Sequence, residues 1–164
     1  MKNKNLLWIQ ANKKKYFFII LHIIFPLVLG ALIYISFRSK RLLVFKWIEF
    51  IGMSKTVIKY RKFLNPLKSI LPNFILFSVP DGLWLYGYIN YFGIVWKNNK
   101  RIYVIFIIIG NILSIFVEIL QKFRFFPGTY CNEDIYFYII FEIVALINVG
   151  RFLENEKSNN DIDR

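Results

Sequence analysis

Apolar residues along the chain gather into four long runs that polar or basic segments separate from one another. A transmembrane helix needs about 20 apolar residues to cross the hydrocarbon core of a bilayer. The runs reach or approach that length, and they cover residues 17–37, 70–96, 102–120 and 135–153. The sequence therefore predicts an all-α fold, a polytopic membrane helical bundle of about four transmembrane helices.

The four runs belong to a single membrane-embedded helical domain, residues 1–153, and residues 154–164 form a polar tail whose composition predicts disorder. The first run follows a basic head, as the apolar part of a signal peptide does. It is longer than that part, and it lacks a small-residue cleavage site, so an uncleaved first span is favoured. His22 lies in this run, where packing between helices explains an imidazole better than catalysis does.

A shorter apolar segment, residues 42–53, lies within the basic stretch after the first run. It is too short to cross a membrane. Lys46 and Glu49 are three positions apart, so they share one side of a helix, and Trp47 is a residue type typical of headgroup depth. The pattern predicts an interfacial amphipathic helix.

The second run is interrupted by the sequence Val79-Pro80-Asp81-Gly82. Proline removes a helical hydrogen bond and glycine permits a bend, so we expect a helix start or a kink at this point. Asp81 then either caps a helix that begins at Gly82 and Leu83 or serves as a functional carboxylate.

The third run carries polar residues on one helical face. Asn111, Ser114, Glu118 and Gln121 occur at i, i+3, i+7 and i+10 among Ile, Leu, Phe and Val. Polar residues in a span either hold a bundle together through hydrogen bonds between helices or line a polar pocket. Both interpretations stay open for Glu118 and Gln121.

The predicted topology brings several polar groups to one side of the membrane. With four spans, residues 38–69 and 121–134 lie on the same side, so the start of the second span approaches the end of the third. Charged groups inside a bilayer cost at least a few kcal/mol unless they face the bundle interior or a wet cavity. The candidate polar pocket consists of Asp81, Glu118, Gln121, Thr129, Asp134 and Glu142. Glu142 lies well inside the fourth span, and the sequence names no partner for it.

Composition and charge agree with a membrane location. Hydrophobic residues make up 57% of the 164 positions, and 22 Lys and Arg against 10 Asp and Glu give a formal net charge of +12. The cations flank the apolar runs, so the lipid bilayer is the expected partner and nucleic acid is not. One cysteine, Cys131, and one histidine, His22, leave too few ligands for a cysteine cluster or a zinc site, and we expect no metal and no cofactor.

The orientation in the membrane follows less directly from the charges. The positive-inside rule gives a tie, because 11 cations would lie on each side of the bilayer. The basic head before the first span favours both termini on the cytoplasmic side. The expected localisation is the cell membrane, as a multi-pass protein.

Two stretches of the chain resemble the VanZ-like family of small bacterial integral membrane proteins. Asn73, Phe77, Pro80 and Gly82 are similar to the Asn and Phe-x-Pro-x-Gly pattern that the family carries on a span. Residues 118–134 are similar to its Glu-x-x-Gln, Pro-Gly-Arg and Asp-Asp patterns. Together the two stretches cover residues 73–134.

The chain departs from the family pattern in the second stretch. Thr129 stands where the family usually has arginine after Pro-Gly, and Glu133 is the first member of the acidic pair. Tyr138 and Phe141 stand where asparagine and glycine usually follow that pair. The missing arginine weakens the case for anion binding by this loop.

The resemblance implies a membrane protein of the cell envelope, linked to glycopeptide resistance, that binds or shields an envelope component such as a lipid-linked precursor. Two alternatives stay open from the residues themselves. One is a membrane enzyme that acts on a lipid-linked envelope substrate with Asp81, Glu118 and Asp134 as acid/base carboxylates. The other is a transporter of a small solute or of protons that uses Glu118 and Glu142.

Overall fold

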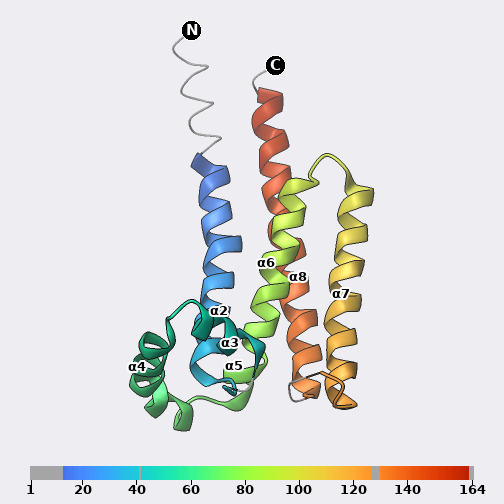
Figure 1. The fold of residues 1–164 in the computed structure, drawn as a ribbon. Helices are drawn as coiled ribbons and strands as arrows, with labels where there is room; N and C mark the ends of the chain where they lie inside the picture. The colour runs from blue at the N-terminus through green and yellow to red at the C-terminus, as the bar shows by residue number, and fades with distance from the viewer. Residues whose placement is uncertain (1–12, 41, 127–129, 163–164) are drawn as a thin grey trace.

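The computed structural model of the chain describes residues 13–40, 42–126 and 130–162, and its side chains as far as Ser158. Helices make up nearly all of these ranges and no strand occurs within them, which confirms the predicted all-α fold. Figure 1 shows long helices that run side by side, with several short helices gathered at one end.

The first long helix runs from Lys13 to Phe37 and changes its hydrogen-bonding pattern near the middle. A π-helical turn, η1 (Ile20–Ile24), precedes α2 (Phe25–Phe37). Pro26 has no amide hydrogen for an α-helical bond, and the Phe25 amide donates to the carbonyl of Ile20 in the wider turn. The helix therefore continues past the proline.

Between the first long helix and the long helix that begins at Val79, the chain forms short helices. They lie together at one end of Figure 1. Their bounds are Leu43–Phe50 for α3, Ser54–Leu64 for α4, Asn65–Ser69 for the 3-10 helix η2, and Asn73–Phe77 for α5. Gly52, at a φ of +74°, provides the left-handed turn between α3 and α4. A helix within residues 42–53 is thus confirmed.

The centre of the bundle is α6 (Val79–Val95), which packs against α8 most extensively and also against α2 and α7. Pro80 lies in its first turn, so the predicted helix start at this sequence is confirmed. The alternative that Asp81 caps the helix is wrong, because α6 begins two residues before Asp81 and has no side-chain cap. Asp81 is therefore available to another helix.

The last two long helices are α7 (Lys100–Lys122) and α8 (Asn132–Ile162). Asn99 caps α7 by accepting from the Ile102 amide at 3.2 Å. The polar connector 97–101 makes α6 and α7 antiparallel neighbours, as predicted (Figure 1).

The tail predicted to be disordered, residues 154–164, is helical as far as Ile162, the last residue described. Its Glu and Lys residues are good helix formers that extend the preceding span. Lys97 also fixes this part of α8 through an ion pair of 2.5 Å with Glu156. Low hydrophobicity therefore marks the end of the apolar run and not the end of the helix.

Three helices are long and apolar enough to cross a membrane, namely Lys13–Phe37, Lys100–Lys122 and Asn132–Ser158. Their outer faces carry exposed Ile, Leu, Val and Phe side chains, as lipid-facing surfaces do. The central α6 differs from them because its neighbours cover it, so it tolerates the fully buried Asn90.

The beginning of the first long helix and the end of α8 lie at the same end of the bundle, opposite the short helices (Figure 1). The rings of Phe18 and Phe152 pack there with centroids 4.4 Å apart.

Because α6 packs closely against α8, an added methyl group should destabilise the protein at one glycine of this contact and not at a glycine outside it. A Cβ at Gly82 would collide with the Phe141 ring, whereas nothing lies within 4 Å of a Cβ at Gly150. Gly82→Ala should therefore lower the free energy of unfolding by about 1–3 kcal/mol. Gly150→Ala, the control, should leave it unchanged or raise it by up to about 1 kcal/mol. Thermal unfolding in detergent measures both, and equal melting temperatures would contradict this packing.

Candidate functional site

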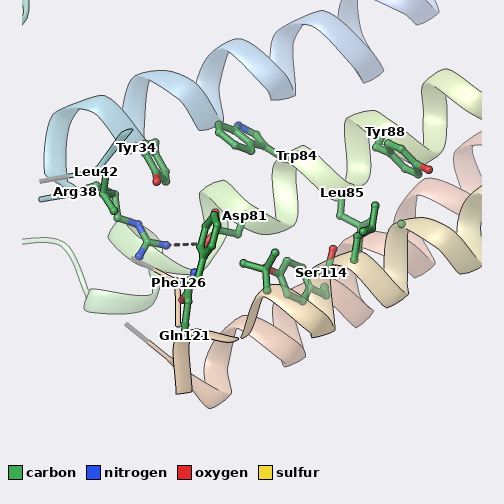
Figure 2. A pocket seen from close by; sticks show the side chains of 14 residues that line it. Tyr34, Arg38, Leu42, Asp81, Trp84, Leu85, Tyr88, Ser114, Gln121 and Phe126 are labelled. Atoms are coloured by element: carbon green, nitrogen blue, oxygen red, sulfur yellow. Dashed lines mark hydrogen bonds and ion pairs between the residues drawn. The ribbon is translucent and has the colours of Figure 1, made fainter. Parts of the chain in front are cut away.

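The central feature of the site is an ion pair between the end of the first helix and the start of α6. The Arg38 Nη2 lies 2.6 Å from Asp81 Oδ2 and also donates to the Phe77 carbonyl at 2.7 Å (Figure 2). Both side chains are largely buried, with 10% and 19% exposed. The guanidinium also lies over the rings of Tyr34 and Phe77. Arg38 therefore compensates the buried Asp81 charge.

A second arginine holds the chain around Arg38 in place. Arg61 of α4 donates to the Ile35 carbonyl at 2.5 Å and to the Arg38 carbonyl at 2.9 Å. These carbonyls lie at the end of α2, where the helix supplies no further amide donors. Arg61 thus ties α4 to the backbone that carries Arg38.

Two more carboxyl groups lie buried beside the ion pair. Glu118 is 2% exposed and Asp134 is 1% exposed, and their carboxyl groups are close enough to interact. The Tyr138 hydroxyl donates to Glu118 Oε1 at a long 3.5 Å. Glu118 Oε2 and Asp134 Oδ1 accept no hydrogen bond from another donor among the described residues, and a proton held by either acid would join the two carboxyl groups to each other. The Ser78 hydroxyl lies close enough to Asp134 to interact with it. Buried polar atoms of this kind are uncommon and can bind a ligand group or water.

A cavity of about 390 Å³ begins at the ion pair and extends between the helices. We call it the Arg38 pocket. Its aromatic and apolar walls include Tyr34, Trp84, Leu85, Tyr88, Phe126 and Tyr138, and its polar residues are Arg38, Asp81, Ser114 and Gln121. Figure 2 shows Arg38, Asp81 and Gln121 at one end of the pocket and Tyr88 at the other.

The structure brings most of the predicted site residues together. Asp81 and Gln121 line the Arg38 pocket, and Glu118 and Asp134 are buried beside it. Thr129 lies outside the described residues.

Glu142 is separate from this group. It accepts a hydrogen bond of 2.9 Å from the Asn111 amide, which supplies the partner that the sequence did not name. The polar face of α7 therefore divides: Asn111 joins two helices, and Ser114 and Gln121 line the pocket. Asn111 is polar because it bonds to another helix, and Ser114 and Gln121 are polar residues that face a cavity.

Sequence reasoning missed several polar residues of the bundle interior. His22 Nδ1 lies 2.5 Å from the Tyr86 hydroxyl, and Asn148 donates to the same hydroxyl at 2.8 Å. This supports the interpretation of His22 as an imidazole packed between helices. Tyr86 and Asn148 stand out in the sequence only as polar groups within apolar runs, and Ser78 has even less to mark it.

The chemistry available to the site is anion binding by Arg38 and proton exchange by the neighbouring carboxyl groups. Within the described parts of the chain, no three His, Cys, Asp or Glu side chains are grouped so that they could hold a metal ion. Comparison with protein-family models, curated proteins and solved structures found no match to the chain.

Burial of the ion pair predicts strong coupling between its members. Asp81→Leu alone leaves Arg38 without its carboxylate and should lower the free energy of unfolding by about 3–5 kcal/mol. Arg38→Met combined with Asp81→Leu should cost less than the sum of the single changes, by at least about 1 kcal/mol. Unfolding in mixed micelles measures all three variants.

Another ion pair within the described residues provides the control for this cycle. Lys97 and Glu156 are each about one-third exposed, so Lys97→Gln and Glu156→Gln should couple by less than about 1 kcal/mol. If the changes at Arg38 and Asp81 were also additive in the free energy of unfolding, the buried ion pair would stabilise the protein no more than the exposed pair does.

Proposed function

We propose that this chain is an integral membrane protein of the cell envelope that binds a lipid-linked, amphipathic ligand in the Arg38 pocket. The observation that carries the proposal is the division of the pocket into a charged end and a longer apolar part. A ligand with an anionic head group and a hydrocarbon chain has the matching division.

The dimensions along the helices suit such a ligand. Tyr88 follows Asp81 by seven residues on α6, which is roughly 10 Å along a helix axis. On α7, Gly110 precedes Gln121 by eleven residues, or roughly 16 Å. Both helices therefore provide polar groups at one end and apolar or aromatic surface farther along. A hydrocarbon chain would lie over α6, with residues of the first helix and of α7 beside it.

The charged end offers a specific contact for the head group. Arg38 Nε is buried and has no hydrogen-bond partner within the described residues. Guanidinium groups bind phosphate and carboxylate oxygens through paired hydrogen bonds. A phosphate at this position would compete with Asp81 for Arg38, so its binding requires protons on the neighbouring carboxyl groups, and the Gln121 amide would supply a neutral donor.

The membrane arrangement that we propose has four spans, with α6 as the second of them. Because α6 is wrapped by other helices, it needs less apolar surface than the three helices that face lipid. The exposed Trp47 and Phe50 support a position of α3 in the membrane interface. An even number of spans agrees with the shared end of the first helix and α8, which we place in the cytoplasm together with both termini.

The buried carboxyl pair supports a second candidate, an enzyme that acts on the same kind of ligand. Glu118 and Asp134 lie beside the pocket, and Tyr138, which lines the pocket, reaches Glu118. The two functions differ in their response to Glu118→Gln, which would preserve binding and abolish turnover. A transporter has less support, because the Glu142 partner Asn111 is seven residues, roughly 10 Å, from Glu118.

The resemblance to VanZ-like proteins is part of this proposal. The two stretches that carry it, around Pro80 and around Glu118, contribute residues to one site. Deletion of the gene should then alter glycopeptide susceptibility or envelope stress, and the wild-type chain should restore it. Full restoration by Glu118→Ala combined with Gln121→Ala, at equal protein level, would exclude this site from that role.

Filling the Arg38 pocket tests ligand binding directly. Ser114→Trp places an indole in the pocket and should weaken binding of a polyprenyl phosphate by at least about tenfold. Ile115→Trp adds the same side chain at a neighbouring position that is 46% exposed, and it should leave binding unchanged. Native mass spectrometry of the detergent-solubilised protein measures bound ligand, and equal binding by both variants would overturn the proposed site.

The proposed orientation predicts the accessibility of Cys131, the single cysteine of the chain. Cys131 is partly exposed and lies at the same end as the Arg38 pocket. A membrane-impermeant maleimide should label it in intact cells, and Cys131→Ser should abolish the labelling. Labelling only after the membrane has been permeabilised would place this end in the cytoplasm instead.

A further inference from the structure

A second cavity lies at the opposite end of the bundle, between the α6–α7 connector and the last part of α8. Its volume is about 420 Å³. Lys97, Lys100, Lys157 and Glu156 are its charged residues, and we call it the Lys97 pocket. It lies apart from the site described above, because no residue lines both pockets.

The charges of this pocket favour an anion. Three lysines line it against a single glutamate, and that glutamate is already paired with Lys97 at 2.5 Å. No carboxylate within the described ranges pairs with Lys100 or Lys157. Helix α7 begins at Lys100, so the positive end of its dipole adds to the positive charge of the pocket.

Two buried hydrogen-bond donors belong to the same pocket. The Trp96 indole nitrogen and the Tyr103 hydroxyl are buried, and both have no hydrogen-bond partner in the part of the chain that the structure describes. Both residues line the cavity. Unpaired donors are costly in an apolar environment, so an acceptor supplied from outside the chain would stabilise this end of the bundle.

The remaining wall is apolar and open. Gly150 and Leu153 of α8 line its open part, whereas the buried Val149 packs directly against Gly93 of α6. At Gly150 nothing lies within 4 Å of the position of a Cβ, so the wall has room for a hydrocarbon chain beside the helix. Cationic, donor-rich and apolar surfaces thus meet in one pocket.

We infer that the Lys97 pocket binds an anionic phospholipid, with its phosphate at Lys97, Lys100 and Lys157 and an acyl chain along α8 at Gly150. The lipid phosphate replaces Glu156 as the partner of Lys97. Anionic lipids are attracted to basic residues at a membrane surface, and the pocket adds a defined position to that attraction. This site is independent of ligand binding in the Arg38 pocket.

Lipid selectivity provides the test. The full-length protein, purified in a zwitterionic detergent, is titrated with phosphatidylglycerol, phosphatidylcholine or inorganic phosphate, and bound lipid is measured by native mass spectrometry. Phosphatidylglycerol should bind in preference to phosphatidylcholine, and inorganic phosphate should not displace it. Equal binding of the two lipids, or displacement by phosphate at equal concentration, would overturn the inference.

Two pairs of variants locate the site. Lys100→Gln with Lys157→Gln should weaken phosphatidylglycerol binding by roughly thirtyfold. Lys13→Gln with Lys14→Gln removes two exposed cations near the start of the first helix and should change binding by less than about threefold. Equal losses in the two double variants would show a general charge effect and would contradict a defined pocket.

The second pair changes shape and not charge. Gly150→Leu fills the open wall and should weaken phosphatidylglycerol binding by at least about tenfold, whereas Gly150→Ala leaves room and should retain it. Unchanged binding by a folded Gly150→Leu variant would exclude the acyl chain from this wall.

Discussion

The ion pair between Arg38 and Asp81 joins the first long helix to α6 at the end of the bundle where the short helices gather. It holds the end of α2 against the start of α6, and Arg61 ties α4 to the same backbone. The pair is buried, so either charge without the other would be strongly unfavourable. Arg38 therefore has a structural role, and in the proposed function its Nε, which has no hydrogen-bond partner among the described residues, would bind the ligand.

Much of this architecture could be predicted from the pattern of apolar residues, because run length and helical period depend only on local sequence. The convergence of Asp81 with Glu118 and Asp134 also followed, since antiparallel spans bring alternate segments together. The rotation of each helix about its axis could not be predicted. It depends on contacts such as Gly82 against Phe141, and it decides that Asn111 meets Glu142 while Ser114 meets a cavity.

The helix that runs through the polar tail was missed for a different reason. Hydropathy shows where a run of apolar residues ends. The backbone hydrogen bonds of the helix can continue beyond that point, and hydropathy does not show where they end. The consequence is functional as well as structural. The extended α8 supplies Glu156 and Lys157, so the tail that was predicted to be disordered contributes to the lining of the Lys97 pocket.

The central position of α6 has a consequence for how the protein is made. This helix carries Asp81, Asn90 and several glycines, so it is poorly suited to remain alone in lipid. Its most extensive packing partner is α8, which is synthesised last. In the proposed four-span arrangement, insertion and folding would therefore overlap in time: α6 would have to be retained near the insertion machinery, or sheltered by the first helix, until α8 arrives to enclose it.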